Sequence, residues 1–150
     1  MKTTVFILSI IWTSMTFAQT TKQYDYTGAY TEGFAIVKLN DKYGFIDFNG
    51  KEVTPLKYDY VQVFSENRAV VKLDGKYGLI DNKGKEVTSC QYDYVWTFCY
   101  GRSIVKMSNK YGFIDENGTE TIPPKYDDAE MFQNCRALVT LNGRKFYIDK

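Results

Sequence analysis

Four aspartates recur in this sequence at a fixed interval of 34 residues: Asp47, Asp81, Asp115 and Asp149. The segments that begin at Asp47 and Asp115 read D-F-N-G and D-E-N-G, which is similar to the start of a calcium-binding loop, but the later glutamate of an EF-hand is missing. An aspartate that opens a turn and accepts backbone N–H groups explains the column more simply. Two of these carboxylates could also serve glycoside hydrolysis, although nothing distinguishes a pair from the repeated set. We expect no metal ligand among them.

A second acidic column follows a tyrosine at the same interval: Tyr24-Asp25, Tyr58-Asp59, Tyr92-Asp93 and Tyr126-Asp127. Such a pair could transfer protons, yet a catalytic pair is seldom copied four times, and a repeated structural hydrogen bond is the better interpretation. The chain contains no histidine, which is the commonest general base and metal ligand. The sequence therefore predicts a protein without catalytic residues or cofactors.

One residue breaks the repeat in an informative way. Trp96 stands where the other units have glycine, glutamine and glutamate, so this column is expected to be exposed. We predict a contact site for a glycan ring or a protein partner that consists of Tyr94, Trp96, Tyr100 and Arg102, with Phe98 on the same strand face. Alternatively, the tryptophan lies flat on its own sheet.

The cysteines number three, which leaves an odd one in any disulfide scheme. Cys90 replaces leucine and proline of other units and is expected to be a small buried apolar residue. Cys99 and Cys135 lie at the same hairpin tip in successive units. A disulfide between these two would join neighbouring tips.

These residues all belong to one longer repeat. The segment Lys42–Asp47 (KYGFID) returns as Lys76–Asp81, as Lys110–Asp115 and, altered, as Arg144–Asp149. The second unit predicts an antiparallel meander without helices. Its strands are expected at Tyr58–Phe64, Arg68–Leu73, Lys76–Asp81 and Lys85–Thr88, with turns at Glu66-Asn67, Asp74-Gly75 and Asn82–Gly84. Both faces of the first strand are apolar, which leaves its core face open.

The fold class is therefore all-β, with tandem units that must stack because one meander cannot bury its own apolar side chains. We expect an open array, and a closed four-bladed ring is the alternative. Gly44, Gly78 and Gly112 occupy strand interiors, where a ring of the next unit is expected to cover them. The last unit has Phe146 at this place, which predicts a cap on the open end.

The N-terminus is not part of the repeat. Lys2, an apolar run and the exit sequence Thr16-Phe17-Ala18 predict a signal peptide at 1–18 that is cleaved before Gln19, rather than a membrane anchor. A short leader, 19–23, precedes a domain at 24–150 whose units are 24–57, 58–91, 92–125 and 126–150. The expected location is periplasmic or extracellular, with no membrane segment left after cleavage. A net charge of +1 without basic clusters argues against nucleic acid as a partner.

The repeated K-Y-G-[FL]-I-D, N-G-K-E and F-x-x-x-x-A-x-V-K-L columns resemble the WG-repeat (KWG) family of bacterial proteins, with tyrosine in place of the family's tryptophan at Tyr43, Tyr77 and Tyr111. The resemblance covers Tyr24 to Asp149 and implies a β-rich, exported module with no catalytic residues to transfer. We predict a non-enzymatic protein that binds or scaffolds a protein partner in the envelope or outside the cell. The alternative partner is an envelope or cell-wall glycan.

Overall fold

The structure, a computed structural model, describes residues 22–150, which contain strands and no helices. The predicted signal peptide at 1–18 lies outside the described residues. Four antiparallel sheets follow one another along the chain. They comprise β1 (Tyr26–Thr27), β2 (Phe34–Leu39) and β3 (Lys42–Asp47); β4 (Tyr60–Val61), β5 (Arg68–Leu73), β6 (Lys76–Asp81) and β7 (Glu86–Tyr92); β8 (Tyr94–Val95), β9 (Arg102–Met107), β10 (Lys110–Asp115) and β11 (Glu120–Tyr126); and β12 (Asp128–Ala129), β13 (Arg136–Leu141) and β14 (Arg144–Asp149).

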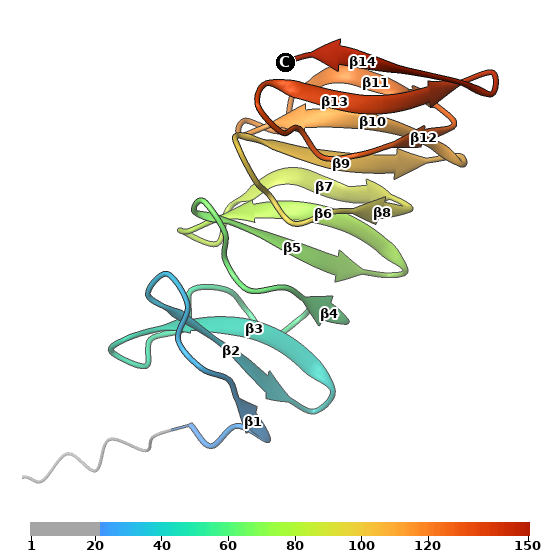
Figure 1. The fold of residues 1–150 in the computed structure, drawn as a ribbon. Helices are drawn as coiled ribbons and strands as arrows, with labels where there is room; N and C mark the ends of the chain where they lie inside the picture. The colour runs from blue at the N-terminus through green and yellow to red at the C-terminus, as the bar shows by residue number, and fades with distance from the viewer. Residues whose placement is uncertain (1–21) are drawn as a thin grey trace, which may run out of the picture.

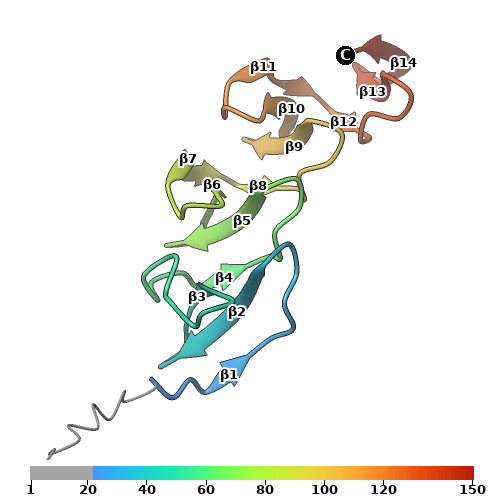
Figure 2. The ribbon, with the colours of Figure 1, turned by 90° about the vertical axis from the view of Figure 1, so that its left-hand side faces the viewer.

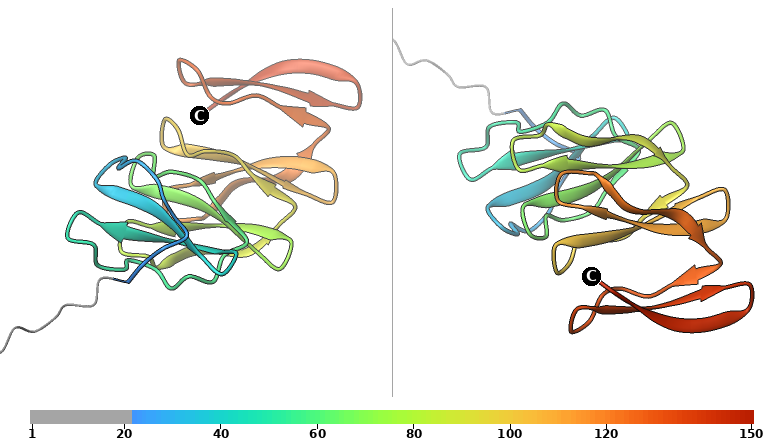
Figure 3. Two further views of the ribbon diagram at one scale, coloured as in Figure 1. Left: turned by 90° about the horizontal axis from the view of Figure 1, so that it is seen from below. Right: turned by 90° about the horizontal axis from the view of Figure 1, so that it is seen from above.

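The sheets stack in chain order, with the first and last at opposite ends of the molecule (Figure 1). Seen from the side, each sheet is displaced from the one before it, like the steps of a stair (Figure 2). The two end-on views show that the sheets do not close around an axis (Figure 3). The all-β open array is confirmed, and the alternative closed ring is not formed. Nothing in the described chain is a helix long and apolar enough to cross a membrane.

A tight hairpin forms the centre of every sheet. In the second, β5 and β6 pair over six residues, from Arg68 opposite Asp81 to Leu73 opposite Lys76. The connecting residues adopt left-handed backbone angles, with φ of 51° at Asp74 and 81° at Gly75. Asp, Asn, Ser and Gly fill this turn in all units because they tolerate that geometry. The predicted turns are confirmed.

The core lies between sheets, not within them. On β5, Ala69 and Val71 face the first sheet and pack in a cluster with Phe45, while Val70 faces the third sheet and packs in a cluster with Tyr92. Both faces of the inner sheets are therefore buried. This explains why β5 has consecutive apolar residues, whereas a strand with one exposed face would alternate apolar and polar residues. Each fully buried aliphatic or aromatic side chain stabilises the stack by about 1.5–3 kcal/mol.

Two predicted strands have different limits in the structure. The strand expected at Tyr58–Phe64 shrinks to Tyr60–Val61, because Tyr58 bridges back to Tyr43 in the preceding sheet. Since this segment bends from one sheet to the next, its side chains do not alternate: Tyr58, Val61 and Phe64 are all buried. The strand expected at Lys85–Thr88 instead spans Glu86–Tyr92 and carries a bulge opposite β6.

That bulge explains the glycine column and overturns the expectation of a covering ring. A Cβ atom at Gly78 would lie 2.8 Å from the carbonyl oxygen of Thr88, and one at Gly112 would lie 2.5 Å from that of Ile122. The backbone of the same unit's return strand, and not a ring of the next unit, therefore excludes a side chain here. The last unit has no return strand, which leaves room for Phe146.

Phe146 does not cap the open end, contrary to the expectation. It shares a face of β14 with Ile148, which packs against the last core cluster, and its ring lies 6.2 Å from that of Tyr126 between centroids. Its side chain therefore points back into the array. Tyr147, on the opposite face, is 66% exposed and forms part of the outer surface.

Candidate binding surface

The aspartates at the ends of β3, β6 and β10 close turns. The Asp47 carboxylate accepts hydrogen bonds from the amides of Asn49 (2.9 Å) and Lys51 (3.0 Å). Asp81 and Asp115 accept the equivalent pairs. This confirms the turn interpretation. Among residues 22–150 there is no group of three or more His, Cys, Asp or Glu side chains arranged to hold a metal ion.

The aspartates of the tyrosine–aspartate column connect neighbouring repeats. One oxygen of Asp93 accepts a hydrogen bond from Lys76 of the preceding repeat at 2.5 Å, and the other accepts the Ser108 amide at 2.8 Å. The lysine hydrogen bond, more than any other contact, lowers the pKa of the Asp93 carboxyl, and the equivalent lysines lower the pKa of Asp59 and Asp127. The predicted structural hydrogen bond is confirmed.

The structure separates the four predicted contact residues into two places. Tyr94 and Trp96 lie together, with ring centroids 4.4 Å apart. Tyr100 and Arg102 lie at the tip of the β8–β9 hairpin, where Cys99 bridges Arg102. Phe98, expected beside Trp96, is instead buried between the second and third sheets. The expected single site is thus two sites.

Tyr94 and Trp96 belong to a longer row of aromatic side chains that we call the aromatic stripe. Ring contacts connect Tyr60 to Tyr77 (6.5 Å between centroids), Tyr77 to Tyr94 (4.9 Å) and Trp96 to Tyr111 (5.7 Å). In the first sheet, Tyr26 and Tyr43 line one groove together with Tyr60. The stripe consists of Tyr26, Tyr43, Tyr60, Tyr77, Tyr94, Trp96 and Tyr111.

Lysines accompany the stripe. The ammonium groups of Lys38, Lys72 and Lys106 lie 5.5, 5.1 and 5.2 Å from the ring centroids of Tyr43, Tyr77 and Tyr111, within the range of cation–π attraction. Two open grooves border these residues. One, of about 530 Å³, lies over the first two sheets, and the other, of about 410 Å³, is lined by Tyr94, Trp96 and Lys106.

The thiols of Cys90, Cys99 and Cys135 are all free in the structure. Cys90, which was expected to be buried, is only partly buried and packs against the core cluster of the first two sheets. Burial raises the pKa of its thiol, which keeps it protonated. The bridge between Cys99 and Cys135 is not formed here and stays a prediction for the oxidised protein.

Comparison with protein families identifies the repeat. The model for the WG containing repeat matches the chain four times, at 21–43, 43–77, 77–111 and 111–144. The chain belongs to the WG-repeat family. Three stripe tyrosines, Tyr43, Tyr77 and Tyr111, lie where one matched WG repeat meets the next. Comparison with curated protein sequences gave no match.

The stripe had a sequence signal that the 34-residue comparison did not reveal. Its tyrosines recur every 17 residues, at 26, 43, 60, 77, 94 and 111, because each WG repeat contributes one from its opening strand and one from the KYG segment. The series ends in the last unit, 126–150, where Asp128 and Lys145 take these positions.

Proposed function

We propose that this WG-repeat protein is a non-enzymatic, exported binding module that holds a protein partner along the aromatic stripe. The observation that carries the proposal is the extent of the stripe over three repeats, with a ring contact between Tyr77 of the second sheet and Tyr94 of the third. Rigid aromatic side chains offer large contact areas at a low cost in conformational entropy, and binding hot spots are enriched in tyrosine and tryptophan. The adjacent lysines favour a partner segment that combines acidic and apolar side chains.

The geometry of the rings favours a protein over a glycan. Stacking on a sugar needs a free ring face, whereas the rings of Tyr43, Tyr77 and Tyr111 each have a lysine ammonium within 5.5 Å of the centroid. The rings of Tyr94 and Trp96 meet edge to face, at an angle of 70°. Glycan binding is the second candidate, because Tyr26 and Tyr60 are 53% and 44% exposed.

The absence of enzymatic activity is supported by how the acidic columns are used. The Asp47 column holds turns and the Asp93 column holds lysines of preceding repeats, so both perform structural roles that recur along the stack. The chain also contains no histidine. Export is supported by the sequence of residues 1–18 alone.

The experiment compares capture of envelope proteins with binding to purified peptidoglycan and polysaccharide. We expect wild-type protein to retain one protein partner, and the double variant Tyr77→Ala/Trp96→Ala to lose it. Tyr147→Ala is the matched control, because Tyr147 is an exposed aromatic away from the stripe. Stripe-dependent binding to glycan alone would replace the proposal with the second candidate, and equal capture by all variants would refute both.

Export has a separate test. Mass spectrometry of the protein from periplasm or culture medium should find Gln19 at the N-terminus. A full-length chain confined to the cytoplasm would contradict the proposed location.

A further inference from the structure

Glutamate carboxylates join the hairpin tips of successive repeats. The carboxylate of Glu32 accepts the backbone amides of Glu66 and Asn67, both at 3.0 Å. The carboxylate of Glu66 in turn accepts the amides of Tyr100 and Gly101, at 2.7 and 2.8 Å. Each link pairs both oxygens of one carboxylate with two consecutive N–H groups, which is a strong, charge-assisted arrangement.

The tips present their amides in this way because their backbone is left-handed at two consecutive residues. The φ angles are 50° and 60° at Glu66 and Asn67, and 51° and 69° at Tyr100 and Gly101. Successive N–H groups in such turns point outwards together and form an anion-binding concavity. Among residues 22–150, two such concavities each bind a glutamate carboxylate.

The fourth tip has the same backbone but receives no carboxylate from the third repeat. Asn134 and Cys135 have φ angles of 48° and 65°, matching the two occupied tips. The residue that should supply the carboxylate is Tyr100, which stands where the earlier repeats have glutamate. Within residues 22–150, neither amide of this pair has a hydrogen-bond partner.

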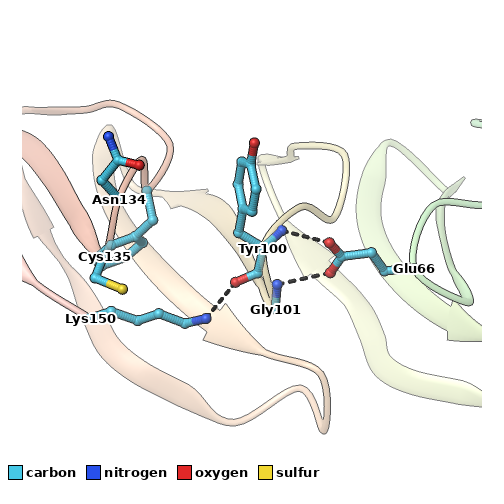
Figure 4. Close-up of a pocket in the computed structure, with 7 residues that line it drawn as sticks. Glu66, Tyr100, Gly101, Asn134, Cys135 and Lys150 are labelled. Carbon is cyan, nitrogen blue, oxygen red and sulfur yellow. Dashed lines mark hydrogen bonds between the residues drawn. The ribbon is translucent and has the colours of Figure 1, made fainter.

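A pocket lies at this break in the series. It has a volume of about 380 Å³ and lies between the third and fourth tips, with Phe132 among its lining residues. Figure 4 shows Asn134 and Cys135 on one side, Tyr100 and Gly101 in the middle, and Glu66 beyond them. The amine of Lys150 donates to the Tyr100 carbonyl oxygen at 2.6 Å and brings a positive charge to the pocket that Cys135 also lines.

We propose that this pocket is a binding site for a carboxylate on an acidic side chain of a partner peptide, held by the amides of Asn134 and Cys135 and by Lys150. The two intact links define the ligand, since each is a glutamate side chain carried by a peptide. The carboxylate of Glu66 also lines the pocket, and the Tyr100 and Gly101 amides already neutralise it in part. The proposal does not depend on the aromatic stripe.

The test follows the backbone amide NMR signals of Asn134 and Cys135 during titration with a blocked glycine–glutamate–glycine peptide. Both signals should move and saturate, and the glutamine counterpart of the peptide should leave them unmoved. Glucuronate distinguishes a sugar carboxylate from a peptide one. If glucuronate moves the signals at lower concentration than the peptide, or if the peptide does not move them, the proposal is wrong.

Two variants test whether a glutamate of the chain itself can fill the pocket. Tyr100→Glu restores the missing link, so the amide signals of Asn134 and Cys135 should shift without ligand. The peptide should then bind at least about tenfold more weakly. Asn117→Glu adds the same charge in an exposed turn of the third sheet and should not do this. An equal effect of both variants would overturn the proposal.

A third variant opens a second site and does not depend on how Tyr100→Glu folds. Glu66→Ala releases the amides of Tyr100 and Gly101, whose signals should then respond to the peptide as those of Asn134 and Cys135 do. Lys150→Gln should weaken binding at the fourth tip. Failure of the Tyr100 and Gly101 signals to respond in Glu66→Ala would refute the carboxylate assignment.

Discussion

The second and fourth repeats have closely similar strands in different surroundings. Leu79 on β6 is fully buried because the third sheet covers it, whereas Tyr147, at the equivalent place on β14, is 66% exposed. Gly78 lies under the return strand of its own repeat, whereas Phe146 has no return strand above it. The difference shows that the neighbouring sheet and the return strand determine whether a given position of the repeat is buried. The repeated sequence alone determines only the hairpin.

The largest expected effect tests burial directly. Leu79→Ala removes a side chain that packs with Val70 and Tyr92 between two sheets, and should lower the free energy of unfolding by about 2–5 kcal/mol. Tyr147→Ala, at the equivalent place in the fourth repeat, should change it by less than about 0.5 kcal/mol. Urea unfolding of both variants checks this. Similar losses would mean that the last sheet is covered in solution.

The next effect concerns the return strand. Gly112→Ala forces a Cβ atom to 2.5 Å from the Ile122 carbonyl oxygen, and should cost about 1–3 kcal/mol or more. Gly44→Ala should cost less, because the nearest atom there, the Thr54 hydroxyl oxygen, lies at 3.1 Å. Phe146→Gly, which lies under no return strand, should also cost less than Gly112→Ala. Denaturant midpoints that rank these variants otherwise would exclude the backbone-contact explanation.

A smaller loss of stability is expected when a tyrosine hydroxyl loses its partner on the next return strand. Tyr92 has such a partner, whereas no return strand follows Tyr126. The Tyr92 hydroxyl donates to Glu120 at 2.9 Å, and Tyr92→Phe should cost about 0.5–1.5 kcal/mol at neutral pH. Tyr126→Phe, in the last repeat, should cost less.

Burial of the Tyr92 side chain and, to a lesser extent, its hydrogen bond to the Glu120 carboxylate raise the pKa of Tyr92 to about 12. The unfolded chain therefore releases this proton first, and stability should fall as the pH rises from about 10 to 12. Unfolding at several alkaline pH values should show a weaker decline in Tyr92→Phe. An unchanged decline would assign the alkaline loss to other groups.

The smallest expected effect is that of the ion pairs between repeats. It should be the same between the second and third repeats as between the third and fourth. Lys76 lowers the pKa of the Asp93 carboxyl and Lys110 lowers that of Asp127, each across one repeat boundary at 2.5 Å. A carboxyl with a lowered folded pKa stabilises the fold above its unfolded pKa of about 3.9, and this contribution is lost as the pH falls through the folded value.

Lys76→Gln and Lys110→Gln should therefore reduce the acid sensitivity of the melting temperature equally, by a small amount because both pairs are solvent-exposed. Thermal melts between neutral and strongly acidic pH measure the change. A clearly larger change for either variant would show that the two boundaries are not equivalent.

The sequence was sufficient to predict the hairpins, because each is a local unit with its own turn residues. Asp74-Gly75 and the pairing of Arg68–Leu73 with Lys76–Asp81 are as expected. The prediction of one strand from Tyr58 to Phe64 is wrong, because this segment crosses from one sheet to the next. Its side chains therefore do not alternate between two faces as they would within a single sheet.

The candidate site was predicted only in part for a related reason. Tyr94 and Trp96 are neighbours along the chain, so their proximity could be inferred, but the contact of Tyr94 with Tyr77 depends on the stacking of the second and third sheets. Tyr100 stands where the first two repeats have Glu32 and Glu66, and it has no carboxylate. This difference becomes meaningful only when the structure shows that each of these glutamates binds the next hairpin tip, a contact that no spacing in the sequence reveals.

The return strand β7 has a mechanical consequence. It pairs with β6 and then continues directly into β8, so a pull on the two ends of the molecule passes through every sheet in series. The first and the last sheet have three strands each, whereas the two inner sheets have four, so the end sheets have the fewest strands to resist such a load. Under force, the array should yield from its ends, one repeat at a time. Each released repeat of 34 residues would add about 110–120 Å of extended chain to the length of the molecule.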